Sequence, residues 1–294
     1  MKTPISAGPI ATRIVRALRT AKGARVVDLR AFREGTARAA ELQKSVTKRE
    51  DLAGFHPAHA LYVYVQNQVS VLAEQLTALP MTAKLADRIE AAQDDYMPGG
   101  PPMSPLTTSY FTCWASFDAA VGQHRETLGT CVLAVGKSLG MDPSFLALVQ
   151  GMQDSCMRVY VHEGCNADGT TDLRDLVSGA RVPCIAPSGW RGARGEVWLA
   201  RVLPPPVGAV EVSVVFTTPY VLRGAREQDW AAYLDRALGA AKGDASKTTA
   251  ALKYSIDWSE YIFAGYAGHV TEAIFLEGLP DVPTSLPHYS PRTR

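Results

Sequence analysis

The stretch MRVYVHEGCNADGTTDL at residues 157–173 marks the place where the hydrophobic period of the chain changes, and it decides the fold class. Over its first six residues apolar side chains alternate with other side chains: Met157, Arg158, Val159, Tyr160, Val161 and His162. A period of two is that of a strand, because successive side chains of a strand point to opposite faces. Residues 166–169, NADG, have the composition of a turn. The stretch therefore predicts a strand that leads into a hairpin.

Four more short strands are predicted after this one, at residues 171–177, 180–186, 196–203 and 210–217. Ser178 and Gly179 form a two-residue hairpin signal between the first two of these four strands. The third is apolar on both faces apart from two charged residues, which predicts a central strand or one that closes a barrel. We therefore expect residues 155–222 to form a five-strand antiparallel meander or a small barrel.

Helical periodicity flanks this β region on both sides. Leucine and valine residues recur at three-and-four spacing over residues 61–76, and Asp142 followed by Pro143 is a typical helix start. After the strands, residues 227–238 and 257–275 have helical spacing again. The expected fold class is α+β, with a mainly helical N-terminal half and a helical C-terminal segment.

This pattern divides the chain into four regions. Residues 1–50 are expected to form basic amphipathic helices, residues 51–154 a helical region, and residues 155–222 the antiparallel β unit. Residues 223–294 are expected to form a helical segment whose proline-rich tail packs on the preceding regions.

Composition excludes several classes of protein. The 294 residues are 47% apolar and include five cysteines without a C-x-x-C pair, which argues against a disulfide-built secreted domain. No apolar run approaches the roughly 18 residues of a membrane-spanning helix. The N-terminus also lacks the pattern of a secretory signal. The sequence therefore predicts a soluble, cytoplasmic protein without a membrane partner.

The net charge of +1 hides a strong asymmetry along the chain. Residues 1–50 carry twelve Lys and Arg against four Asp and Glu, whereas residues 51–294 carry eighteen against twenty-five. Arg13, Arg16 and Arg19 repeat at i+3. Aliphatic residues repeat at i+4 in the same segment, so a helix here would have a cationic face opposite an aliphatic one. A second helix is expected at about residues 26–46.

Three interpretations of this basic segment remain open. It docks on the acidic remainder of its own chain, or it contacts an anionic partner, or it is an Arg-rich transit peptide. The anionic partner would be nucleic acid phosphates or an acidic protein surface. The candidate residues for binding an anion or a partner are Arg13, Arg16, Arg19 and Arg25.

Sequence motifs for common catalytic sites are absent or incomplete. There is no G-x-S-x-G and no H-E-x-x-H, and the sequence AVGKS at residues 134–138 lacks the first glycine of a phosphate-binding loop and lies in a helical pattern. Four possible zinc ligands, Cys156, His162, Cys165 and Cys184, have no paired spacing. We therefore expect neither a metal site nor a cofactor.

The remaining catalytic candidate lies in the predicted C-terminal helix. Tyr266, His269 and Glu272 follow one another at i, i+3 and i+6, and an imidazole beside a carboxylate is a possible general base. A proline-rich loop at residues 97–105, preceded by Asp94 and Asp95, would then cover a ligand.

The function that the sequence favours is a non-catalytic binding or regulatory protein. It would engage another protein through the basic N-terminal helices and the proline-rich loops, since no complete catalytic motif or cofactor motif is found. Two alternatives stay open: a hydrolase or transferase that uses His269 and Glu272, and a nucleic-acid-binding protein that uses the basic segment. The sequence does not indicate an oligomeric state.

Overall fold

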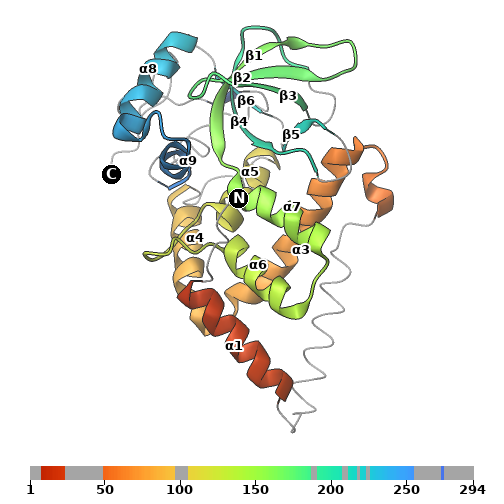
Figure 1. Ribbon diagram of the computed structural model, residues 1–294, viewed down its shortest axis with the longest axis vertical. Coiled ribbons are helices and arrows are strands. Elements are labelled where there is room, and N and C mark those ends of the chain that lie inside the picture. Colours follow the sequence, from red (N-terminus) through yellow and green to blue (C-terminus); the bar gives the residue numbers. More distant parts are fainter. Residues whose placement is uncertain are drawn as a thin grey trace. The chain divides into compact units, whose positions relative to one another are not determined.

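The structure is a computed structural model (Figure 1). It describes residues 8–23, 49–96, 105–186, 191–206, 211–216, 219–222, 226–254 and 273–274. The described residues fall into two compact units. The first unit lies within Met1–Gly54, Ala60–Glu90 and Ala115–Gln153. The second unit lies within Phe55–His59, Ala91–Trp114 and Asp154–Arg294.

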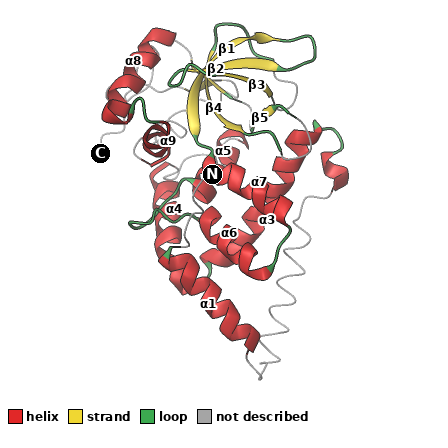
Figure 2. Cartoon of the chain, in the orientation of Figure 1, coloured by secondary structure: helices red, strands yellow, loops and turns green. Residues whose placement is uncertain are grey.

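The first unit is helical (Figure 2). Its α-helices, some of which extend beyond the unit at one end, are α1 (Pro9–Gly23), α3 (Pro57–Thr77), α4 (Ala83–Tyr96), α6 (Leu128–Leu139) and α7 (Pro143–Asp154). Two short 3₁₀ helices are η1 (Arg49–Leu52) and η2 (Pro80–Thr82). Helix α5 (Pro105–Phe117) begins in the second unit and ends in the first.

The starts of α6 and α7 follow from local sequence. Thr127 forms a capping box with Thr130, in which each side chain bonds the backbone amide of the other residue. The Asp142 carboxylate accepts hydrogen bonds from the amides of Ser144 and Phe145, which confirms the predicted start of α7. Both helices therefore begin where side chains satisfy amides that have no partner within the helix.

The second unit contains a closed five-strand barrel. Its strands are β1 (Met157–Cys165), β2 (Thr171–Asp175), β3 (Arg181–Ile185), β4 (Val197–Leu203) and β5 (Ser213–Val215). They pair in the order β1, β2, β3, β5 and β4, and β4 pairs with β1 to close the ring. Strand β6 (Tyr220–Leu222) pairs with β4, and β7 (Ala273–Ile274) pairs with β6.

Both faces of β4 are buried, which explains the apolar sequence of this strand. Tyr160, Trp198 and Ala200 cluster with residues from β2, β3, β5 and β6. The alternate residues Val159 and Leu199 join a second cluster that includes side chains of α8 (Glu227–Leu238). Four α8 residues are buried there at helical spacing, as the sequence predicts: Trp230, Tyr233, Leu234 and Leu238. Two shorter helices follow, η4 (Gly239–Ala241) and α9 (Ala245–Tyr254).

The α+β fold class and the small five-strand barrel are therefore confirmed, with three corrections in detail. First, β3 and β5 pair in parallel, so the barrel is mixed and not a purely antiparallel meander. Second, the β2–β3 connection is longer than a two-residue hairpin, because β2 ends at Asp175 and β3 begins at Arg181; within it the Asp175 carboxylate accepts from the amides of Val177 and Ser178. Third, Ala273–Ile274 pair with a strand, whereas the sequence predicts a helix there.

Several predicted features lie outside the described residues. These are the second basic helix at 26–46, most of the proline-rich loop at 97–105, most of the helix at 257–275 and the tail beyond it. Within the described part of the chain, no helix combines the length and the apolar character needed to cross a membrane.

A glycine-to-alanine substitution at Gly192 tests the packing of the barrel. Gly192 has a positive φ of 62°, and a Cβ at this position would lie 2.3 Å from the buried ring of Trp198. We expect Gly192→Ala to lower the free energy of unfolding by about 2–4 kcal/mol, since it adds overpacking to a disfavoured backbone conformation.

The matched control is Gly179→Ala, measured in the same urea denaturation series. Gly179 has a φ of 70° but no atom within 4 Å of an added Cβ. Its expected cost is about 1 kcal/mol, from the backbone alone. Equal losses in the two variants would contradict the close packing of Trp198 against the chain at Gly192.

Candidate anion-binding site

Helix α1 packs on α6 of its own chain through its aliphatic face. Ile10, Ala11 and Ile14 are buried, and Leu18 is half-buried. The arginines of α1 that the structure describes are exposed. The amphipathic pattern of this helix is therefore as the sequence predicts, and its apolar face is covered by the first unit itself.

A buried carboxylate holds the first turn of α1. Glu126 accepts hydrogen bonds from the backbone amides of Ile10, at 3.0 Å, and of Ala11, at 2.9 Å. These amides have no partner within the helix, and a carboxylate at this end also interacts favourably with the helix dipole. No side chain in the first turn of α1 itself could supply this carboxylate, because that turn contains no acidic residue.

The backbone around Glu126 fixes the direction of its side chain. Glu126 forms a short antiparallel bridge with Val121 and directly precedes the capping box of α6. The Thr127 hydroxyl donates to Gln153 of α7, whose amide in turn donates to the Phe117 carbonyl. This network ties the Glu126 segment to two helices of the first unit.

Gly8 is the residue that allows α1 to approach this carboxylate. A Cβ at Gly8 would lie 2.2 Å from Cδ of Glu126, a distance that no real side chain tolerates. Any larger residue would therefore displace either the Glu126 carboxylate or the start of α1 and so weaken this contact.

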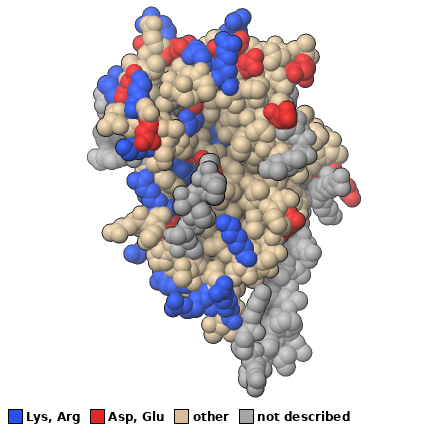
Figure 3. Space-filling model, in the orientation of Figure 1, with Lys and Arg blue, Asp and Glu red and all other residues tan. Residues whose placement is uncertain are grey.

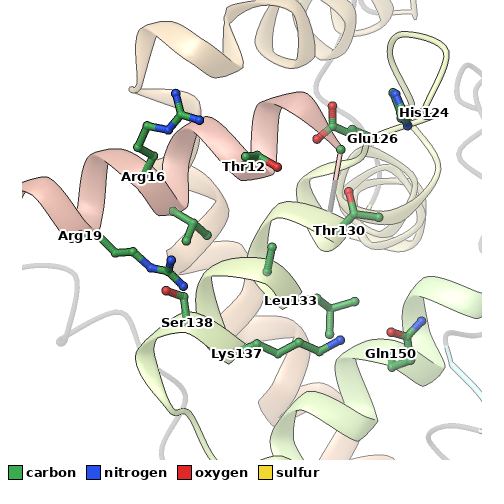
Figure 4. A pocket seen from close by; sticks show the side chains of 13 residues that line it. Thr12, Arg16, Arg19, His124, Glu126, Thr130, Leu133, Lys137, Ser138 and Gln150 are labelled. Carbon is green, nitrogen blue, oxygen red and sulfur yellow. The ribbon is translucent and has the colours of Figure 1, made fainter. Parts of the chain in front are cut away.

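A cavity of about 540 Å³ lies beside this contact between α1 and α6 (Figure 4). Its lining residues come from α1, from the 124–126 segment, from α6 and from α7. They are Gly8, Thr12, Val15, Arg16, Arg19, His124, Glu126, Thr130, Leu133, Ala134, Lys137, Ser138 and Gln150. In Figure 4 the guanidinium of Arg19 points toward Ser138, and Lys137 extends toward Gln150.

The cavity carries a surplus of positive charge. Arg16, Arg19 and Lys137 are exposed, and none of them forms an ion pair with any residue that the structure describes. The one acidic residue of the lining, Glu126, uses both carboxylate oxygens for the amides of α1. Lys and Arg side chains also gather over α1 on the face shown in Figure 3. This arrangement is suited to an anion.

Only some of the site residues predicted from the sequence line the cavity. Arg16 and Arg19 line the cavity, whereas Arg13 is exposed on α1, does not line it, and donates to the Pro9 carbonyl. Arg25 lies outside the described residues, and so do Tyr266, His269 and Glu272. The general-base hypothesis therefore stays a prediction.

Two residues of the cavity belong to a motif that the sequence analysis set aside. Lys137 and Ser138 come from the AVGKS stretch, which lies within α6 and so has the helical context expected from the sequence. That context is wrong for a phosphate-binding loop, but it places both side chains on the side of α6 that faces the cavity. The role of Glu126 has no sequence signal, because its contact spans more than 110 residues.

The four candidate zinc ligands are not brought together. Cys156 belongs to the cluster under α8, and Cys184 is buried inside the barrel. A register shift of β1 between His162 and Gly164 does place His162 and Cys165 on one side, with Sγ 3.7 Å from Nε2. In the described part of the chain, no three His, Cys, Asp or Glu side chains gather in a way that could hold a metal ion.

Neutralising the carboxylate that caps α1 tests how this helix is held. Glu126→Gln removes the charge and replaces one of the two accepting oxygens with an amide nitrogen, which cannot accept from the backbone N–H that it faces in this buried position. We expect the free energy of unfolding to fall by about 1.5–3 kcal/mol, the range for hydrogen bonds to charged groups.

Glu74→Gln is the control, because Glu74 is exposed on α3. Its expected effect is within about 0.5 kcal/mol. Both variants are compared with the wild type by urea denaturation, and equal stability of all three proteins would argue against the cap.

Thiol titration tests the burial of the cysteines. Cys165 is exposed and the other four are buried. Burial raises the pKa of Cys131, near the Glu126 carboxylate, and of Cys184, near Asp172, to about 12 in each case. We expect Ellman's reagent to modify one thiol per native chain near neutral pH and none in Cys165→Ser, because the thiolate is the reactive form. Rapid modification of a second thiol in the native protein would contradict this burial.

Comparisons with known proteins leave the interpretation to the geometry of the chain itself. No family model matches the sequence, and neither a curated protein nor a solved structure matches the chain. The cavity beside α1, with its surplus of positive charge, is therefore the basis for a functional conclusion.

Proposed function

We propose that this chain is a non-catalytic binding protein that engages an acidic protein surface through the cationic face of α1, formed by Arg13, Arg16 and Arg19. The proposal rests on the difference in burial between the two faces of α1. Its aliphatic face packs on its own chain, while these three arginines are exposed.

The charges of α1 are not offset by contacts within the described structure. Glu126, the carboxylate nearest to the start of the helix, bonds backbone amides and no arginine. No ion pair among the described residues includes Arg13, Arg16 or Arg19. This supports a partner outside the chain over simple neutralisation by its acidic remainder.

A rigid helix gives such a partner a fixed row of charges. The cap at Glu126 and the buried aliphatic residues hold α1 in place, so the arginines lose little freedom of the backbone when a partner binds. Exposed ion pairs contribute only about 0–1 kcal/mol each, and their main effects are on the association rate and on its salt dependence. We therefore expect an interaction of modest affinity that weakens as salt increases.

Direct binding to a defined acidic polymer tests the proposal. We expect labelled polyglutamate to bind the wild type at low salt, measured by fluorescence anisotropy. The combined variant Arg13→Gln, Arg16→Gln, Arg19→Gln should weaken binding at least about tenfold, since a tenfold change corresponds to about 1.4 kcal/mol in total. Raising the salt concentration from about 50 to 200 mM should reduce the wild-type affinity.

The control variant removes the same amount of charge elsewhere. Lys84, Arg194 and Lys247 are exposed and lie outside α1, and their substitution by Gln should change the affinity less than about twofold. Equal losses in the two triple variants would overturn the proposal. Tighter binding of duplex DNA than of polyglutamate, lost with the α1 arginines, would overturn it in favour of nucleic acid as the partner.

A further inference from the structure

We propose that the cavity between α1 and α6 binds the phosphate group of a small phosphorylated organic molecule, held by Arg19 and Ser138, with Lys137 adding positive charge to the cavity. This ligand is additional to the acidic partner of the proposed function. Lys137 and Ser138 belong to α6, whereas the proposed partner surface belongs to α1. The two sites share Arg16 and Arg19, but each also has residues of its own.

The charge of the cavity fits a dianion better than a single carboxylate. Arg16, Arg19 and Lys137 contribute three positive charges from two helices, and the Glu126 carboxylate is already bonded to two amides. A phosphate monoester carries a charge of about −1.5 to −2 near neutral pH, compared with −1 for a carboxylate. The phosphate therefore compensates more of the surplus.

The donors around Arg19 suit the oxygens of a phosphate. The guanidinium of Arg19 can bond two oxygens at once, and the ammonium of Lys137, which extends toward Gln150, adds a further positive charge to the cavity. The Ser138 hydroxyl is half-buried and has no hydrogen-bond partner among the described residues. Figure 4 shows the Arg19 guanidinium directed toward this hydroxyl, so both groups can donate hydrogen bonds to one phosphate that lies between them.

Hydrogen bonds to two carbonyls at the end of α6 reduce the repulsion between this backbone and an anion. Carbonyl groups at the C-terminus of a helix carry partial negative charge when they lack a partner. Here the Gly136 carbonyl accepts from the amides of Gly140 and Met141, and the Lys137 carbonyl also accepts from Gly140. Two carbonyls of the last turn, those of Gly136 and Lys137, are therefore bonded where this turn presents the cation and the hydroxyl.

The size and the apolar wall of the cavity indicate that the phosphate is part of a larger molecule. A volume of about 540 Å³ lies within the range of about 300–1,000 Å³ that is usual for small-molecule sites and far exceeds one phosphate ion. Val15, Leu133 and Ala134 add apolar surface to the lining. An organic group attached to the phosphate would bury part of this surface and gain affinity over inorganic phosphate.

Titration calorimetry with phenyl phosphate and with inorganic phosphate tests the proposal on the full-length chain. We expect phenyl phosphate to bind at one site per chain and more tightly than inorganic phosphate. Lys137→Gln should raise the dissociation constant of phenyl phosphate at least about tenfold, because it removes one of the positive charges of the cavity, and Ser138→Ala about threefold to tenfold, because it removes one donor. Lys137 is exposed, so its substitution should leave the thermal stability unchanged.

Arg13→Gln separates this site from the surface that binds the acidic partner. Arg13 lies on α1 but does not line the cavity, so its substitution should change phenyl phosphate binding less than about twofold while it weakens polyglutamate binding. Lys137→Gln should have the opposite pattern. If the wild type binds phenyl phosphate but does not bind polyglutamate, the proposed function is refuted and the cavity site is supported.

Three results would overturn the cavity site. The first is the absence of saturable binding of phenyl phosphate to the wild type. The second is an equal effect of Lys137→Gln and Arg13→Gln on that binding. The third is binding of phenyl phosphate no tighter than that of inorganic phosphate, which would indicate only a weak ion site.

Discussion

Two hydrogen bonds from the start of α1 to one buried carboxylate are the constraint on which the exposed cationic face of this helix depends. Glu126 accepts from the amides of Ile10 and Ala11, and Gly8 leaves the space that this contact needs. A helix of 15 residues is marginal in water by itself, so α1 depends on packing and on its cap for stability. The same contact sets which side of α1 meets α6 and which side remains exposed.

This constraint explains why a nearly neutral chain has a local cationic site. For residues 8–23, the aliphatic side of the basic segment docks on its own chain, while the described arginines are left without ion pairs. The carboxylate that could have neutralised them bonds backbone amides instead. Lys137, in the last turn of α6, adds a third cation to the cavity that Arg16 and Arg19 line. The charge surplus seen in the sequence thus becomes a surface that an outside anion can neutralise.

The sequence predicts those parts of the fold that have a short hydrophobic period, and it misses those that depend on distant pairing. The strands β1 to β5 and the buried face of α8 follow from alternation and from three-and-four spacing. The parallel pairing of β3 with β5 and the register shift at Gly164 cannot be predicted in this way, because the local pattern of residues does not determine them. Arg16 and Arg19, which line the cavity, could be named as candidate residues from their spacing on one helix. Glu126 and Lys137 could not, since only the docking of α1 on α6 gives them their roles.

Amide hydrogen exchange at the start of α1 tests the central claim most directly. The first amides of a helix have no partner within it and normally exchange rapidly. Because Ile10 and Ala11 donate to the buried Glu126 carboxylate, we expect their amides to exchange at least about a hundredfold more slowly than in an unstructured peptide. In Glu126→Gln at least one of the two amides should lose this protection, because only one acceptor oxygen remains. Exchange of both amides at the unstructured rate in the wild type would contradict the account.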